Sequence, residues 1–222
     1  MYEELRIKNL YDLDETIASK LFENLDYPWE ALLLIHDFIL QLGPTLPTDV
    51  YMQAGEDVWI AKDASVFSSA YIKGPAIIGK GAEVRHCAFI RGNAIVGEGA
   101  VVGNSTELKN VVLFNGVQVP HYNYVGDSIL GFKAHMGAGS ITSNVKSDKS
   151  LVDVTIRGER IHTGLKKFGA MLGDHVEIGC NTVMNPGTVI GRNSSVYPVS
   201  MIREFVPANS IYKKQGEVAE RR

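Results

Sequence analysis

The sequence predicts an all-β fold, a parallel β-helix, preceded by a short α-helical extension. Three observations predict it: large apolar residues recur every six positions, small residues follow them four positions later, and glycines recur between the two. A period of six matches neither an α-helix nor a simple strand, but it fits a short strand followed by a corner. Three such units make one triangular coil, and stacked coils bury a core that a single coil could not.

The large apolar residues form two series with the same phase. The first series is Ile60, Val66, Ile72, Ile78, Val84, Ile90, Val96, Val102, Leu108 and Phe114. The second is Leu172, Ile178, Met184, Ile190, Val196 and Ile202, and Leu130 and Met136 fit a shorter stretch between them. The small residues begin with Ala64, Ala70, Ala76 and Ala82. A β-sandwich is the alternative fold, but its turns recur at about 8–12 residues, and the strict spacing of six disfavours it.

The repeat is interrupted twice. The interval from Phe114 to Leu130 is not a multiple of six, so the register is expected to slip between them. A second interruption spans about 146–169, where apolar and polar residues alternate before Gly158, and this pattern predicts an extruded hairpin. Since regular coils are committed to packing, these breaks are where a functional site is expected.

Outside the repeat, the chain is expected to divide simply. Residues 1–50 should form the helical extension, with helices at Leu13–Leu25 and Pro28–Leu42 packed on the end of the solenoid or on a neighbouring chain. A linker over 44–57 leads into the β-helix of residues 56–207, and 208–222 is a polar tail.

Composition excludes several classes of function. A net charge of −3 does not suggest a nucleic-acid-binding protein. The segment Met1–Arg6 has no signal-peptide character, and the apolar run Ala31–Leu42 is too short to span a bilayer. Cys87 and Cys180 indicate neither a disulfide framework nor a metal site. We therefore expect a cytoplasmic protein with no membrane partner.

Two patterns imitate other chemistry. Residues 74–80 resemble a P-loop, but Gly81 stands where Ser or Thr must bind magnesium, so the segment is assigned to the repeat. The nearest pairs of histidines, His121 with His135 and His162 with His175, are each more than two hexads apart, whereas a β-helical metal site needs a close pair. No metal is expected.

Residues that are 18 positions apart should lie on one face of adjacent coils. Lys73, Arg91 and Lys109 have this spacing, and three stacked cations favour a bound anion such as phosphate. The alternative is a solvated basic stripe neutralised by carboxylates such as Glu107. His121 follows Pro120 within the register break and could act as a general base, although it could equally be a packing or surface histidine.

Two segments carry a resemblance to a known family. Residues 120–127 read PHYNYVGD, and residues 136–144 read MGAGSITSN. Together they resemble the acetyltransferase domain of the bacterial bifunctional N-acetylglucosamine-1-phosphate uridylyltransferase/glucosamine-1-phosphate acetyltransferase, over roughly residues 56–215. The resemblance implies a left-handed β-helix, acetyl-CoA as co-substrate without a metal, and a homotrimer with its sites at subunit junctions.

The resemblance also implies roles for single residues. His121 falls on the family's general base, and Ala138 falls near the acetyl-CoA thioester. The residues on sugar-phosphate or sugar-binding positions are Arg91, Lys109, Tyr124, His135, Asn144 and Lys167. The remaining acetyl-CoA positions are Cys180, Pro198 and, near the CoA phosphate, Lys213.

Several positions depart from the family pattern. His135 and Val145 replace an asparagine and a tyrosine near the sugar, and Gln215 replaces an arginine that binds a CoA phosphate. Cys180 and Pro198 replace a serine and an alanine of the CoA groove. About 55 residues stand in place of the family's nucleotidyltransferase domain, so no uridylyl transfer is expected.

The function expected from the resemblance is N-acetylation of an amino-sugar 1-phosphate, such as glucosamine 1-phosphate, in nucleotide-sugar biosynthesis. The departures leave two alternatives open. One is acetylation of another small amine, and the other is a non-catalytic subunit that binds a sugar phosphate.

Overall fold

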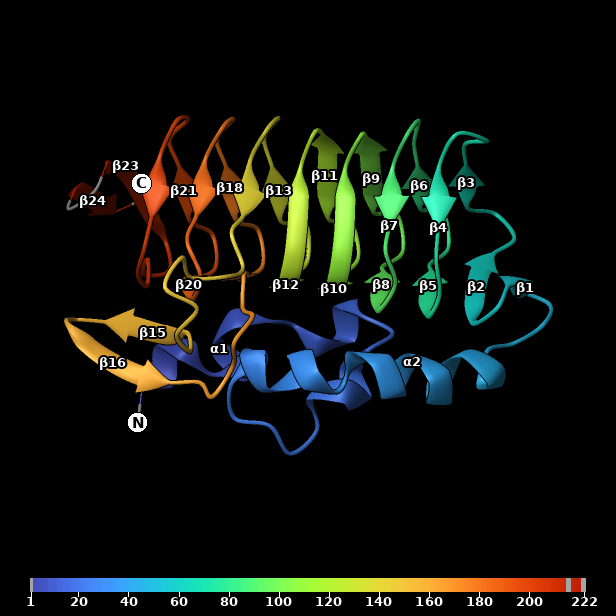
Figure 1. Ribbon diagram of the computed structural model, residues 1–222, viewed down its shortest axis with the longest axis horizontal. Coiled ribbons are helices and arrows are strands. Elements are labelled where there is room, and N and C mark those ends of the chain that lie inside the picture. Colours follow the sequence, from blue (N-terminus) through green and yellow to red (C-terminus); the bar gives the residue numbers. More distant parts are fainter. Residues whose placement is uncertain (1, 215–216, 221–222) are drawn as a thin grey trace.

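The computed structural model describes residues 2–214 and 217–220, and most of them form a β-solenoid with three faces (Figure 1). The site face contains β4 (Tyr71–Ile72), β7 (Phe89–Ile90), the first halves of β10 (Glu107–Leu113) and β12 (Tyr124–Leu130), β14 (Ile141–Thr142), β19 (Val183–Met184) and β22 (Met201–Ile202). The covered face contains β2 (Val58–Ala61), β5 (Ala76–Ile78), β8 (Ala94–Val96), the second halves of β10 and β12, β17 (Ala170–Leu172) and β20 (Thr188–Ile190). The third face contains β3 (Ser65–Val66), β6 (Glu83–Val84), β9 (Val101–Asn104), β11 (Gln118–His121), β13 (His135–Met136), β18 (Glu177–Ile178), β21 (Ser195–Val196) and β23 (Ser210–Lys214).

The solenoid is parallel and left-handed, as expected. Neighbouring coils pair in parallel, for example Ile72 with Ile90 and Ile178 with Val196. In Figure 1 the near strands β4 and β7 run downward and the distant β6 and β9 run upward, while the chain advances from β3 at the right to β21 at the left. This winding is left-handed, and the predicted fold class is confirmed.

The register slip lies earlier than the spacing predicted. Ile90 pairs with Leu108, three full hexads on, but Ala94 pairs with Val111, which is one position short of that spacing. The coil is therefore shortened by one residue at the corner around Asn110, and Leu113 rather than Phe114 continues the inward column. Phe114 is buried all the same, because it packs outside the coil against rings of the N-terminal segment.

The N-terminal segment, residues 2–50, lies along the flank of the solenoid and not on its end (Figure 1). Its elements are short: η1 (Glu3–Leu5), α1 (Ile7–Leu10), η2 (Leu13–Glu15), η3 (Ser19–Phe22), η4 (Pro28–Leu33), α2 (Ile35–Leu42) and η5 (Gly43–Thr45). The prediction of one helix over Leu13–Leu25 is wrong. The side chain of Asp12 accepts from the backbone N–H of Asp14, and that of Thr16 accepts from Ala18, so local side-chain bonds replace the helical ladder.

The outward side chains of the covered face explain why the N-terminal segment lies along the flank. They are apolar and fully buried: Ile77, Ile95, Val112, Ile129, Met171 and Val189. The elements η4 and α2 contact β8, β10 and β12 and bury Trp29, Leu32, Ile35 and Ile39 there. One face of the prism is therefore closed within the chain, which leaves the other two faces for ligands and partners.

Polar anchors hold the segment at one corner of that face. Asp174 is 3% exposed, accepts from the backbone N–H groups of Asp12 and Phe132 at 2.8 Å each, and pairs with Arg192 at 2.9 Å. Burial raises the pKa of Asp174, although these donors oppose the shift.

Tyr11 makes the stability of the protein depend on pH. Its ring is 2% exposed and packs 5.1 Å from that of Phe114, and burial raises its pKa well above the ordinary value. Since the folded state favours the neutral phenol, its contribution to stability is complete below about pH 10, the unfolded pKa, and is lost as the pH rises further. We expect the thermal midpoint of the wild type to fall above about pH 10 more steeply than that of Tyr11→Phe. Parallel slopes would contradict this.

The other segments differ in part from expectation. The hairpin predicted near 146–169 is confirmed, with β15 (Asp153–Ile156) antiparallel to β16 (Glu159–His162). The expected linker contains β1 (Tyr51–Gly55), which pairs with β2. The expected polar tail adds β23 to the third face, followed by β24 (Glu217–Glu220). Both ends thus continue the sheet because their backbone groups pair with the terminal coils.

Candidate functional site

The edge between the third face and the site face carries His121, and we call it the His121 edge. Successive coils place His86, Asn104, His121, Ala138, Cys180 and Pro198 along it. The row is held by backbone bonds, such as Gly139 N–H to the carbonyl of His121 at 3.0 Å and Asn181 N–H to that of Ala138 at 2.8 Å. The structure therefore aligns the expected general base with three of the expected acetyl-CoA residues, one coil apart in turn.

The corner at His121 is rigid, whereas its imidazole is open to solvent. Asn123 is 2% exposed, and its side-chain amide donates to the carbonyls of Gly137 and Ser140 at 2.9 and 3.1 Å. Its side-chain oxygen accepts from the backbone N–H of His121 at 3.1 Å. Within residues 2–214 and 217–220, the imidazole has no hydrogen-bond partner. The backbone of His121 is thus held in place, and its imidazole is available to a ligand.

The cation column is Lys73, Arg91 and Lys109, at the opposite edge of the site face. The registers of β4, β7 and β10 stack the three residues in successive coils, as the spacing predicted. Two of them have carboxylate partners, however. Arg91 lies 2.7 Å from Glu107, whose hydrogen bond raises the pKa of Arg91, and Lys109 lies 2.8 Å from Asp127. The neutralising carboxylates of the alternative interpretation are therefore present.

Asp127 is the centre of this site and was not singled out from the sequence. Its side chain is 4% exposed and accepts from Lys109 Nζ at 2.8 Å, Asn110 Nδ2 at 3.0 Å and Asn144 Nδ2 at 2.5 Å. Asn144 Nδ2 also donates to Tyr124 Oη at 3.2 Å. Asp127 lies at a corner with φ 48°, a left-handed conformation that Asp and Asn tolerate, and this backbone angle is not visible in the sequence.

Tyr124 lies between the two edges. It pairs with Glu107 on one side and Ile141 on the other, so its side chain points outward from the middle of the site face. Burial, and then the charge of Asp127, raise its pKa, so the phenol stays neutral. His121 and the cation column thus border the same face, with Tyr124 between them and Asn144 beside the cation column, where it donates to Tyr124.

Other expected site residues lie elsewhere. His135 belongs to β13 on the third face, and its Nδ1 lies 2.8 Å from Glu177, so the structure does not bring it to the cation column. Lys167 is exposed just before the hairpin insertion rejoins the coil, where Phe168 N–H donates to the carbonyl of Asn144 at 3.0 Å. This hydrogen bond brings the backbone next to Lys167 close to Asn144 in space.

The C-terminal end of the His121 edge is basic. Tyr197 N–H donates to the carbonyl of Tyr212 at 2.9 Å, which places Lys213 beside the coil of Pro198. Lys213 and its neighbour Lys214 lie 3.7 and 3.1 Å from Glu217. Gln215 lies outside the described residues.

Uncovered apolar side chains gather on the site face and the His121 edge. They are Phe67, Tyr71, Phe89, Tyr122, Tyr197, Val199 and Met201, each at least 39% exposed. Among the described residues, no group of three His, Cys, Asp or Glu side chains could hold a metal ion. No helix of the described chain is both long and apolar enough to cross a membrane.

Comparison with known families identifies a matching family model. The family model described as the GMPPB C-terminal domain matches residues 72–189, which is more than half of the 222 residues.

Curated relatives share the same region. The bifunctional sugar-1-phosphate nucleotidylyltransferase/acetyltransferase of Sulfurisphaera tokodaii is 36% identical over 112 residues, which are 50% of this chain and 28% of that protein. The bifunctional protein GlmU of Methanococcus vannielii is 34% identical over 122 residues, or 54% of this chain and 29% of that protein. The chain thus spans less than a third of the length of these relatives.

Solved structures with a similar fold include two acetyltransferases. A mutant of perosamine N-acetyltransferase from Caulobacter crescentus, in complex with CoA and GDP-perosamine, is 15% identical with a TM-score of 0.38, covering 73% of this chain and 55% of that one. The acetyltransferase domain of PglB from Neisseria gonorrhoeae, in complex with acetyl coenzyme A, is 18% identical with a TM-score of 0.37, covering 74% and 57%.

Proposed function

The chain belongs to the GMPPB C-terminal domain family, and from this premise we propose that it transfers the acetyl group of acetyl-CoA to the amine of an amino-sugar 1-phosphate. One observation carries the proposal: the exposed imidazole of His121 borders the same face as the cation column, with Tyr124 between them and Asn144 bonded to Tyr124 beside the cation column. The relative named as a bifunctional sugar-1-phosphate nucleotidylyltransferase/acetyltransferase supports the class of reaction.

Acetyl-CoA fits along the His121 edge. The small side chains of Ala138 and Cys180 leave room above the row, and Lys213 and Lys214 stand at its end, where CoA carries phosphates. The backbone N–H of Ala138 has no acceptor within the described chain, so it can donate to the thioester oxygen. Pantetheine would then run parallel to the solenoid axis.

The cation column would hold the 1-phosphate despite its carboxylate partners. A guanidinium has five N–H donors and an ammonium has three, so one carboxylate leaves most of them free. Arg91 is 47% exposed at its side chain and Lys109 is 25% exposed, so both can reach a ligand. Tyr124 would contact the sugar between the phosphate and His121, and Asn144 would contact it beside the cation column.

The reaction needs no acyl-enzyme. The amine nitrogen attacks the thioester carbonyl while His121 takes a proton from that nitrogen. The oxyanion that forms accepts a hydrogen bond from Ala138 N–H. When the C–S bond breaks, the imidazolium returns the proton to the CoA thiolate, and the products are the N-acetyl sugar phosphate and CoA.

We also propose a homotrimer whose copies meet at this site. The covered face is closed by the chain itself, whereas the apolar side chains of the site face and His121 edge are uncovered, including Tyr122 at 65% and Val199 at 80%. Large exposed apolar groups mark contacts with partners. A second copy over the His121 edge would also enclose the acetyl-CoA groove.

Thiol release tests the function. With acetyl-CoA, release should be fastest for glucosamine 1-phosphate among glucosamine 1-phosphate, glucosamine and simple primary amines. Preference for an amine without phosphate would instead favour acetylation of another small amine. Absence of acetyl-CoA binding by calorimetry, with glucosamine 1-phosphate still bound, would favour a non-catalytic sugar-phosphate-binding subunit.

Arg91→Ala should raise the KM for the sugar phosphate by about tenfold and leave the kcat nearly unchanged, because it removes charge-assisted hydrogen bonds to the phosphate. Arg85→Ala is the matched control, since Arg85 pairs with Glu83 on the third face. Equal KM values for Arg91→Ala and the wild type would contradict phosphate binding by the cation column.

A further inference from the structure

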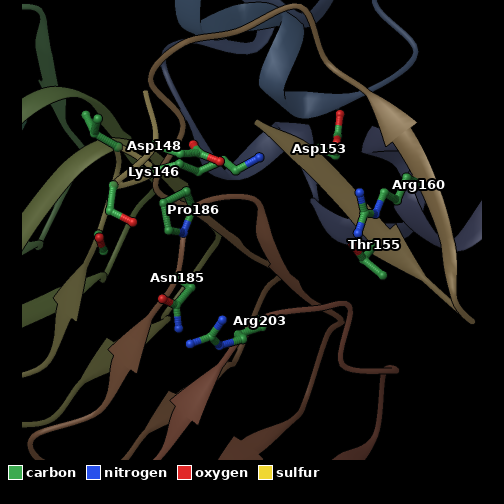
Figure 2. Close-up of a pocket in the computed structure, with 11 residues that line it drawn as sticks. Lys146, Asp148, Asp153, Thr155, Arg160, Asn185, Pro186 and Arg203 are labelled. Carbon is green, nitrogen blue, oxygen red and sulfur yellow. The ribbon is translucent and has the colours of Figure 1, made fainter. Parts of the chain in front are cut away.

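The hairpin insertion and the solenoid enclose a cavity that the proposed reaction does not use. The insertion leaves the site face after β14 and returns before β17, and the cavity has a volume of about 520 Å³. Figure 2 shows Arg160 and Thr155 on the hairpin wall, with Asn185 and Arg203 on the solenoid wall. Ser143 also lines it and directly precedes Asn144 in the chain, so the cavity adjoins the candidate site.

The charges of the cavity suit an acidic ligand that also carries hydroxyl groups. Within the described residues, neither Arg160 nor Arg203 has a carboxylate partner. Lys146 adds a third cation to the lining, against two carboxylates: Asp148, whose pKa is lowered by hydrogen bonds from Ser150, and Asp153, which lies 2.8 Å from His162. Free guanidinium groups bind a carboxylate or phosphate in two-point fashion, and carboxylate oxygens accept from sugar hydroxyls.

The strand registers show where the cavity lies relative to the cation column. Lys109 pairs with Gly126, and the registers of β12, β14, β19 and β22 then place Ser143, Asn185 and Arg203 in the same column, one coil further each. At about 4.8 Å per coil, Asn185 lies on the order of 10 Å beyond Gly126, away from Arg91 and Lys109. An acceptor with its phosphate on the cation column would therefore point its opposite end at the cavity.

We propose that the hairpin cavity is an acceptor subsite for a second acidic group, a carboxylate or a phosphate, carried on the amino sugar at the end opposite its 1-phosphate. This inference rests on the proposed function and narrows the substrate to doubly anionic amino sugars. Arg160 and Arg203 bind the second anion from the two walls, and the hairpin determines specificity.

The test compares three acceptors with the full-length chain: glucosamine 1-phosphate, glucosamine 1,6-bisphosphate and 2-amino-2-deoxyglucuronic acid 1-phosphate. The KM for at least one doubly anionic acceptor should be lower than that for glucosamine 1-phosphate by about tenfold or more. The last two acceptors distinguish phosphate from carboxylate as the second group. Arg160→Ala and Arg203→Ala should abolish the preference and leave glucosamine 1-phosphate kinetics unchanged, whereas Arg85→Ala should retain it.

Failure of this inference can be separated from failure of the proposed function. Thiol release without a preference for either doubly anionic acceptor, or a preference that survives both arginine variants, would overturn the subsite alone. If no acceptor releases thiol, calorimetry with the same three compounds decides: loss of the tighter binding in Arg160→Ala and Arg203→Ala supports the subsite, and equal binding of all three overturns it.

Discussion

His121→Gln is expected to lower the kcat for acetyl transfer by about 10²–10⁴-fold, because general-base catalysis contributes that much when a positioned group takes a proton in the transition state. Glutamine keeps the size and polarity of the side chain but cannot accept the proton of the amine. The backbone of the corner should not move, since Asn123 holds it through the main chain and not through the imidazole. Binding of the sugar phosphate, measured by calorimetry, should therefore stay within about twofold.

The matched control for this variant is His86→Gln. His86 lies on the same edge, two coils before His121, and is also exposed, so both substitutions change an exposed imidazole of one row. Its Nδ1 lies 3.2 Å from Ser69 Oγ, away from Tyr124 and the cation column. His86→Gln should retain full turnover. An unchanged kcat in His121→Gln would show that His121 is not the general base.

The solenoid and the cation column could be predicted because both depend on a local repeat. A corner every six residues fixes which side chains point inward, and three corners bring residue i above residue i+18. This arithmetic places Arg91 over Lys109 without any knowledge of the remaining chain, and the register of β7 with β10 agrees. Handedness is different, since the period of six allows either hand; here it came from a family resemblance.

The shortened corner at Asn110 could not be located from periodicity. Phe114 is apolar and buried, so it continued the series of six, although Leu113 occupies the inward column. Phe114 is apolar for another reason: it packs against Tyr11 and Phe22 of the N-terminal segment. The sequence pattern thus does not distinguish burial inside the solenoid from burial against the N-terminal segment.

The sequence contains a signal for the position of the N-terminal segment. On the covered face, outward positions such as Ile77, Ile95 and Val112 are apolar in coil after coil, whereas the equivalent column of the site face is interrupted by the charged Glu107. An apolar outward column must be covered by something. An unbroken column of this kind indicated a cover along the flank, not on the end.

The stacking of the cations could be predicted from the repeat, but their carboxylate partners could not. Whether Lys109 faces a ligand or Asp127 depends on a corner whose shape follows from the left-handed backbone at Asp127 and Asn110, and side-chain spacing does not contain that information. His135 shows the same limit. It follows His121 by little more than two hexads in the sequence. It nevertheless lies on the third face, where its Nδ1 lies 2.8 Å from the carboxylate of Glu177.

Asp127→Ala is expected to have the largest effect on stability, lowering the free energy of unfolding by about 3–5 kcal/mol, the range for removing one partner of a buried ion pair. The variant leaves Lys109 without its counter-charge and removes an acceptor from Asn110 and Asn144. Because Lys109 is 25% exposed, water can solvate part of its charge, which favours the lower end of the range. Chemical denaturation measures the change.

Glu107→Ala is the matched control, because it removes a carboxylate from the neighbouring cation of the same column. The pair Arg91–Glu107 is exposed, at 47% and 32% of the two side chains, so its loss should change the free energy of unfolding by no more than about 1 kcal/mol. Equal effects of the two variants would mean that Asp127 is no more than another surface carboxylate. A large effect confined to Asp127 would instead mean that the same corner supports both the fold and the acceptor site, because Lys109 and Asn144 depend on one buried carboxylate for their positions.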